Sequence, residues 1–259
     1  MTAKPETAGG DEALFEYLLR LGDNALILGQ RLGEWISNGP TVELDIALGN
    51  QSLDLIGQAR MLFDYAGRVE GKGRSEDDIA FLRDVLDFRN VLLVEQPNGD
   101  FGQTVMRQFL YGTYASALYE RLSGSTDNEL AGIAQKAVKE MAYHARHSGE
   151  WVVRLGDGTE ESHGRVQAGL DFLWPYSHEL FIADGIDRTM AERGIGIDPS
   201  DLKDDWLEVV AGVIGRATLT LPETNWVPDG GKQGRHTENL GYILSDLQFM
   251  QRAYPGAEW

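Results

Sequence analysis

The chain has 259 residues, with 23 Lys and Arg against 41 Asp and Glu, which gives a formal net charge of −18. At 42% apolar residues this length can enclose a hydrophobic core, whereas the charge argues against nucleic acids and anionic membrane surfaces as partners. The absence of cysteine excludes disulfides, thiolate nucleophiles and Cys-based zinc or iron–sulfur sites. We expect a cytoplasmic protein with a loose N-terminal tail over residues 1–11 and a single domain over 12–259.

Apolar residues recur every three or four positions from Leu14 to Trp35, which is typical of one face of a long helix. Turn residues at Asn38-Gly39-Pro40 end this pattern, and similar turn residues separate the helices predicted after it. A capping-box pattern at Ser75 and a capping residue at Asp127 mark two of the later starts. The next four helices are predicted over about 42–69, 75–93, 101–122 and 127–155.

The remaining third of the chain is less regular. A helix is predicted over 165–190 with an interruption near Trp174-Pro175, and Ser200 is expected to cap another through about residue 217. Residues 221–234 are rich in Pro and Gly and predict a long loop or lid before a last helix over 237–254. Long helices joined by short loops favour an all-α antiparallel bundle with flanking helices.

Glycines inside the first two predicted helices indicate close helix packing, because each costs about 1 kcal/mol relative to Ala in a helix interior. They lie at positions 22, 29 and 33 in the first helix and at 49, 57 and 67 in the second.

Bundles of this kind commonly hold a di-iron site, built from one Glu on each of two helices and a Glu-x-x-His motif on each of two others. Glu140 precedes His144 by four residues rather than three, and Met141 occupies the position that should supply an oxygen. The one formal match, Glu160 to His163, follows a Gly-rich turn, and we interpret it as coincidence. The sequence therefore lacks a complete set of iron ligands.

The second predicted helix carries polar residues along one seam, at Gln51, Asp54 and Gln58. If the seam is buried, these side chains need partners, and Asp54 could be matched by Lys139, Arg146 or a histidine of the fifth helix. Two simpler interpretations remain open. The seam could be a solvated face, and the histidines could be ordinary, partly buried residues.

Several motifs resemble, in chain order, the C subunits of bacterial ring-1,2-phenylacetyl-CoA epoxidases. Those in the first half of the chain are Leu19-Arg20-Leu21-Gly22-Asp23, Gln30-Arg31-Leu32-Gly33-Glu34-Trp35, Asp54-Leu55-Ile56-Gly57-Gln58-Ala59-Arg60 and Leu92-Leu93-Val94-Glu95-Gln96-Pro97-Asn98-Gly99. Those in the second half are Lys139-Glu140…Tyr143-His144, Gly230-Gly231-Lys232…Gly234…His236-Thr237-Glu238…Leu240-Gly241 and Gln251-Arg252…Pro255-Gly256…Trp259. The resemblance extends from about Leu18 to the C-terminus.

This resemblance implies a ferritin-like fold and a place in a multicomponent monooxygenase of phenylacetate catabolism. In that family an A subunit holds the di-iron centre and binds the CoA thioester, a small B subunit links the heterodimers, and a reductase with flavin and a 2Fe–2S cluster transfers electrons from NADPH. The complex converts phenylacetyl-CoA and O2 to the ring 1,2-epoxide. The C subunit is the structural, non-catalytic partner, so we expect no metal or cofactor in this chain.

Two groups of residues follow as expectations. A polar core in place of metal is expected from Asp23, Gln51, Asp54, Gln58, Lys139, Glu140 and His144. A partner interface or lid is expected around Lys232, His236, Glu238, Arg252 and Trp259, although Trp206, Trp226 and Trp259 could equally anchor the loop and last helix to their own core. The rival functions are an autonomous ferritin-like di-metal oxidase that uses Asp54, Glu140, His144 and His147, and a plain helical scaffold.

Overall fold

The computed structural model describes residues 11–257 and contains no β-strand within that range. The all-α prediction is confirmed. The α-helices are α1 (Glu12–Gly33), α2 (Val42–Glu70), α3 (Glu76–Phe81), α4 (Leu92–Glu95), α5 (Phe101–Leu122), α6 (Asn128–Gly156), α7 (Glu160–Ser177), α8 (Gly185–Glu192), α9 (Lys203–Arg216) and α10 (Glu238–Ala253). Short 3-10 turns lie at Val85–Asp87, His178–Phe181, Pro199–Leu202 and Gly231–Gln233.

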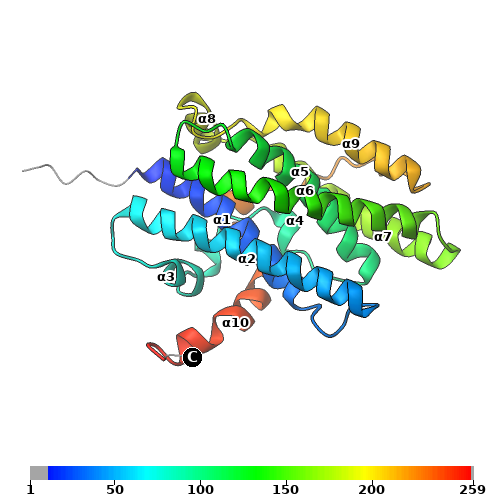
Figure 1. The fold of residues 1–259 in the computed structure, drawn as a ribbon, viewed down its shortest axis with the longest axis horizontal. Helices are drawn as coiled ribbons and strands as arrows, with labels where there is room; N and C mark the ends of the chain where they lie inside the picture. The colour runs from blue at the N-terminus through cyan, green and yellow to red at the C-terminus, as the bar shows by residue number, and fades with distance from the viewer. Residues whose placement is uncertain (1–10, 258–259) are drawn as a thin grey trace, which may run out of the picture.

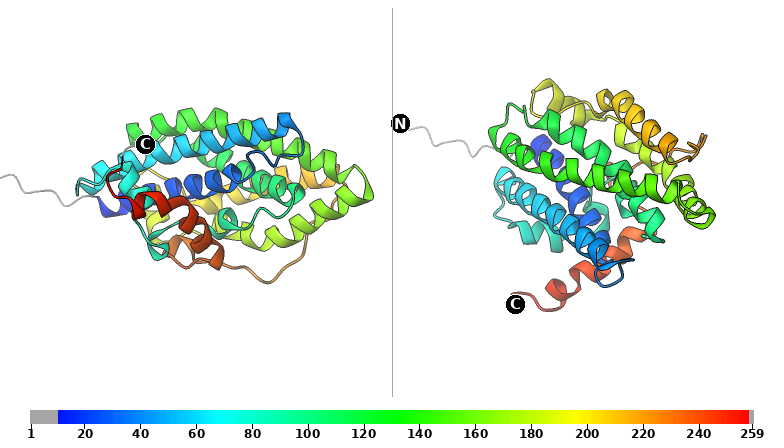
Figure 2. Two further views of the ribbon diagram at one scale, coloured as in Figure 1. Left: turned by 90° about the horizontal axis from the view of Figure 1, so that it is seen from below. Right: turned by 45° about the vertical axis from the view of Figure 1, so that its right-hand side comes forward.

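Two helical hairpins form the ferritin-like bundle, α1 with α2 and α5 with α6 (Figure 1). Helix α2 lies beside α6 and joins the two hairpins, while α7 and α9 pack on α5 and α6, and α8 packs on α1. Helix α10 extends from the opposite side of the body, where it contacts α1, α3 and α4 (Figure 2). None of the helices in residues 11–257 is long and apolar enough to cross a membrane.

The bundle helices begin at residues whose side chains accept hydrogen bonds from the free N–H groups of the first turn. Asp11, Thr41, Asp100 and Asp127 cap α1, α2, α5 and α6 in this way. The four predicted long helices end within about three residues of the observed bounds, and the capping role of Asp127 is confirmed. Residues 1–10 of the expected N-terminal tail lie outside the described range, whereas Asp11 belongs to the cap of α1.

The single helix predicted over 75–93 is wrong. Helix α3 ends at Phe81, and α4 begins only at Leu92. At the end of α3, side chains donate to the carbonyl oxygens that would accept from backbone N–H groups if the helix continued. The Arg83 guanidinium donates to Ile79 O at 2.6 Å, and the Gln248 amide donates to Ala80 O at 3.1 Å. These partners come from tertiary packing, which a periodicity argument does not include.

Two boundaries in the last third also need correction. The helix predicted from residue 165 begins at Glu160, capped by Thr159, and it continues through Pro175 before it ends at Ser177. Ser200 does not cap a helix, because Asp198 accepts from the Ser200 N–H within a 3-10 turn and α9 starts after that turn. The predicted loop before the last helix is confirmed, with α10 starting at Glu238.

Close packing between α1 and α2 is confirmed at two of the predicted glycines. A Cβ on Gly22 would lie 2.4 Å from the Phe63 ring, and one on Gly29 would lie 3.3 Å from the Ser52 carbonyl oxygen. The explanation is wrong for Gly57, where a Cβ would meet nothing within 4 Å. Within residues 11–257, helix packing therefore does not explain Gly57.

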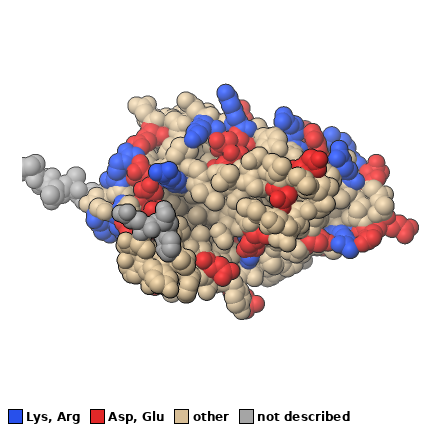
Figure 3. Space-filling model, turned by 60° about the horizontal axis from the view of Figure 1, so that its bottom comes forward, with Lys and Arg blue, Asp and Glu red and all other residues tan. Residues whose placement is uncertain are grey.

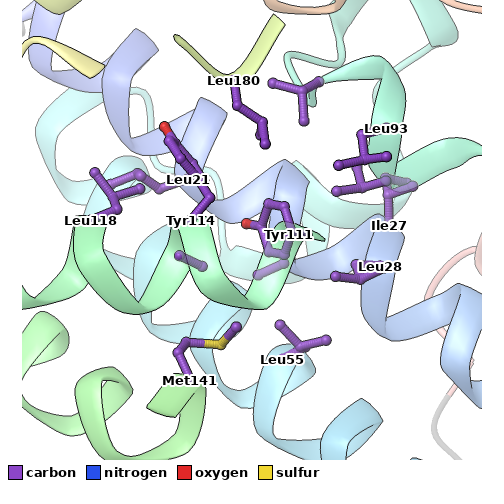
Figure 4. Close-up of a cluster of buried hydrophobic side chains, with 14 of the residues drawn as sticks. Leu21, Ile27, Leu28, Leu55, Leu93, Tyr111, Tyr114, Leu118, Met141 and Leu180 are labelled. Atoms are coloured by element: carbon purple, nitrogen blue, oxygen red, sulfur yellow. The ribbon is translucent and has the colours of Figure 1, made fainter. Parts of the chain in front are cut away.

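A cluster of buried apolar side chains lies between the two hairpins (Figure 4). Leu28 of α1, Leu55 of α2, Tyr111 of α5 and Met141 of α6 converge there, and each is at most 2% exposed. The tyrosine hydroxyl is the one polar group that these four side chains bring to this interior.

Candidate functional site

Polar side chains pair across α2 and α6, and three of these pairs involve residues of the predicted α2 seam. The Gln51 amide donates to His147 Nδ1 at 3.0 Å, His144 Nε2 donates to Asp54 Oδ2 at 3.0 Å, and the Gln58 amide donates to Glu140 Oε2 at 2.8 Å. As the residue number rises on α2 it falls on α6, so the pairs follow the antiparallel register of the two helices. We call these six residues the α2–α6 ladder.

The ladder shows whether the α2 seam is buried or is a solvated face. Gln51 and Gln58 are each 1% exposed, so the solvated-face interpretation is wrong for them, whereas the Asp54 side chain keeps 35% of its surface exposed. Asp54 is matched by a histidine rather than by Lys139 or Arg146.

Both ladder histidines have a pKa below the usual value. Burial lowers the pKa of His144, and the hydrogen bond to Asp54 offsets this effect only in part. The Nδ1 atom of His144 is buried and has no hydrogen-bond partner within the described chain, so a proton added there would lack an acceptor. Burial likewise lowers the pKa of His147, whose Nδ1 accepts from Gln51.

The ladder does not provide the donor set of a di-iron centre. Its carboxylates are bonded to an amide and to an imidazole, and the bundle interior beside it is filled by Leu55 and Met141. Over residues 11–257, no group of three or more His, Asp or Glu side chains could hold a metal ion. His163 of the Glu-x-x-His match lies in the first turn of α7 and bonds to the carbonyl oxygen of Gly156, the last residue of α6.

The expected polar core needs correction at two residues. Asp23 is fully buried on α1, but it binds the Arg83 guanidinium and accepts from the Arg89 N–H at 2.8 Å, so it belongs to the packing of the segment after α3. Lys139 lies on the exposed side of α6 and bonds to none of the ladder residues. The residue numbers alone did not show that Asp23 lies on the side of α1 that meets the segment after α3, or that Lys139 lies on the outer side of α6.

A second buried polar group holds the C-terminal segment to the core. Glu95 of α4 accepts from His236 Nδ1 at 2.8 Å and from the Thr237 N–H at 2.6 Å, and the side chains of Glu95 and His236 are both 0% exposed. His236 Nε2 also donates to the Phe88 carbonyl oxygen at 3.0 Å. Burial opposes a charge on His236, but the hydrogen bond and charge of Glu95 outweigh it and raise the pKa of His236. We call this group the Glu95 cluster.

Related contacts fix the loop that leads into this segment. Glu179 accepts from the N–H groups of Gly230 and Gly231, each at 2.8 Å, and Lys232 Nζ donates to Asp187 at 2.9 Å. Lys232 and His236 therefore hold this segment, which was expected to be a partner interface or lid, to their own fold.

The other expected interface residues are placed differently. Glu238 is exposed, Arg252 binds the Arg83 carbonyl oxygen and Asp84, and Trp259 lies outside the described residues. Trp206 is buried and donates to the Leu110 carbonyl oxygen, whereas Trp226 is 59% exposed. These two tryptophans thus divide between the core and the surface.

Sequence reasoning did not single out Glu95 and Glu179 as functional positions. The available signal for Glu95 was an acid directly after four apolar residues, inside a segment that carried the family resemblance. A charged residue in such a run needs a buried partner. No comparable pattern marks Glu179.

Comparisons with known proteins agree with the resemblance. The model of a family described as phenylacetic acid catabolic protein matches residues 1–259. A curated relative from Escherichia coli (strain K12), described as the C subunit of 1,2-phenylacetyl-CoA epoxidase, is 48% identical over 247 residues. The aligned region covers 95% of this chain and 99% of that relative.

Proposed function

The chain belongs to the family of phenylacetic acid catabolic proteins, and on this premise we propose that it is the structural C-type subunit of a phenylacetyl-CoA epoxidase. In this role it binds no metal, and it pairs with and stabilises the di-iron subunit that carries out the chemistry. The chain takes no catalytic step of its own.

The observation that carries the proposal is the way the α2–α6 ladder uses its potential ligands. Asp54, Glu140, His144 and His147 are each bonded pairwise across the two helices, and Leu55 and Met141 occupy the interior beside them. A di-iron pair needs several carboxylates that converge on one point, together with histidines in register. For this reason the autonomous di-metal oxidase is not favoured.

The remaining partners follow from the family resemblance. We propose a heterodimer with the di-iron subunit, a small bridging subunit between heterodimers, and transient contact of the assembly with a flavin and 2Fe–2S reductase in the cytoplasm. This chain contributes a rigid helical body to that assembly, stabilised by the ladder and by the Glu95 cluster.

The test is to express the chain alone and together with the di-iron subunit from the same organism, in iron-rich medium and without chelator. We expect near-zero iron in the folded single chain, and a stable complex whose iron belongs to the other subunit. The complex should epoxidise phenylacetyl-CoA once the remaining components are added.

Two results would overturn the proposal. One is about two irons per chain in the protein expressed alone, lost in the Glu140→Ala and His144→Ala variants. The other is failure of the wild-type chain to form a complex with the di-iron subunit, which would favour the plain scaffold.

A further inference from the structure

One side of α10 faces away from the body and carries acids and aromatic rings in turn. Tyr242 and Phe249 are 68% and 60% exposed, and the acids Glu238 and Asp246 are exposed as well. The four residues follow one another at intervals of four, four and three, so helical geometry places them on the same side over about 17 Å. We call them the α10 outer face. Helix α10 lies on the side of the molecule that Figure 3 turns toward the viewer, where most of the surface is uncharged.

The cations nearest to α10 in sequence are bound to other acids. Arg252 is the one Lys or Arg within α10, and its guanidinium binds Asp84 at 2.9 Å and the Arg83 carbonyl oxygen at 2.8 Å. Arg235, which precedes the helix, lies 3.6 Å from a carboxylate oxygen of Asp229. Each of these cations therefore has a partner away from the α10 outer face.

The elements on which α10 packs add no unpaired cation. Helix α10 contacts α1, α3, α4 and the turn at Val85–Asp87, and the last three contain no Lys or Arg, whereas the first turn of α3 carries three acids. The two arginines of α1 are buried and ion-paired. Between α3 and α4, Arg83 and Arg89 are paired with Asp23 and Glu16. The surroundings of the α10 outer face are thus acidic.

A hollow beside Phe249 is suited to a Lys or Arg side chain. It has a volume of about 480 Å³ and lies between α10 and the segment before α4, with Phe249 and Val85 in its wall. Arg252 also lines it, but its charge is paired with Asp84. A cation is attracted to the face of an aromatic ring, and the methylene stem of Lys or Arg packs on apolar side chains. The acids one turn along the same helix face supply the opposite charge.

We propose that the α10 outer face docks a basic segment of another epoxidase subunit, whose Lys or Arg side chains bind the acids and lie against the rings. This inference rests on the proposed function and adds to it a contact surface and its chemistry. Charge argues against two other occupants. A second copy of this chain would bring another net charge of −18, and an anionic lipid surface would be repelled by the acids.

Two variants separate the contribution of the charges from that of the rings. Glu238→Gln combined with Asp246→Asn removes both charges and keeps the side-chain shapes, so affinity at low salt should fall by about 5- to 10-fold. At high salt this variant should bind as the wild type does, because salt screens exposed charges. Phe249→Leu keeps an apolar side chain without the ring and should lower affinity by about 3-fold.

Affinities are measured by biolayer interferometry with the intact di-iron subunit and the intact bridging subunit immobilised separately. The losses should appear with the subunit that carries the basic segment. Matched controls make the same kinds of change elsewhere. Asp204→Asn combined with Glu208→Gln removes two exposed acids of α9, and Trp226→Leu removes a ring that is 59% exposed. Both controls should bind as the wild type does, and unchanged circular dichroism spectra verify that all variants are folded.

The outcomes distinguish the inference from the proposed function. If the wild-type chain binds neither subunit, the proposed function fails. If the wild type binds and both α10 variants bind like the controls, the docking surface is wrong although the function stands. An equal loss for the double variant at low and high salt would contradict the basic partner. If the chain alone is a dimer that the double variant converts to a monomer, a second copy covers the face and the assigned partner is overturned.

Discussion

Replacement of Glu95 by Gln should loosen the C-terminal segment from the bundle. Glu95 accepts hydrogen bonds from Asn90, from His236 and twice from Thr237, and its side chain is 0% exposed. Gln has nearly the same shape but supplies one acceptor oxygen and no charge, so His236 loses its counter-ion. Removal of one partner from a buried charge pair costs about 3–5 kcal/mol. For a chain of this size that corresponds to a fall in Tm of about 6–20 °C.

The pH dependence provides an independent signature. The pKa of His236 is raised in the folded state, so its contribution to stability is fully present below the unfolded value of 6.5 and is lost as the pH rises through the folded value. In Glu95→Gln the buried His236 has no counter-charge, so its pKa should no longer be raised. The loss of stability with rising pH should then disappear. The ladder histidines give the opposite pH dependence. Burial lowers their pKa in the folded state, so their contribution to stability is lost as the pH falls below about 6.5.

The assay is urea unfolding between pH 6 and 9, combined with hydrogen exchange of the backbone amides. Protection in α10 and in the loop before it should fall first in the variant, since Thr237, which Glu95 binds, directly precedes that helix. Asp84→Asn is the control, because it removes an ion pair to Arg252 in which the Asp84 side chain is 78% exposed, and such pairs contribute at most about 1 kcal/mol. An unchanged Tm together with an unchanged pH profile in Glu95→Gln would refute the role assigned to the Glu95 cluster.

The same contacts allow three further predictions. Asp54→Ala leaves the buried His144 Nε2–H without an acceptor and should lower the free energy of unfolding by about 1–3 kcal/mol. Asp54→Asn keeps an acceptor oxygen and should lower it less. Equal urea midpoints for the wild type and both variants would contradict the pairing of Asp54 with His144. Gly22→Ala places a methyl group against the Phe63 ring and should lower the free energy of unfolding by about 1–3 kcal/mol. Gly164→Ala, where a Cβ has open space, should not destabilise the protein. Thermal melts of the two variants test this difference, and equal Tm values would contradict it. Ferrous iron added anaerobically should leave the Tm of the isolated chain unchanged, and a rise that saturates with iron concentration would reveal a bound metal.

Local spacing along the chain was enough to predict the long helices and most of their ends. The three- and four-residue spacing of Leu14, Leu18 and Leu21 and the capping residue Asp127 depend on neighbours along the chain, so they can be recognised without a fold. The same spacing placed Gln51, Asp54 and Gln58 on one face of a helix, and the broken Glu-x-x-His pattern showed that the iron ligands are incomplete. The resemblance in the ordered motifs identified the family.

Which polar residues meet could be learned only from the packed helices. Asp54 pairs with His144 rather than with Lys139 because of the register between α2 and α6, and Asp23 binds Arg83 because its side of α1 packs on the segment after α3. The end of α3 at Phe81 depends on Gln248, and the burial of His236 depends on Glu95, in both cases more than 100 residues away. Helical periodicity is a local property fixed by bonds between near neighbours. The partners of a buried polar group are set by how whole helices pack, and that information is not contained in the spacing of residues along one helix.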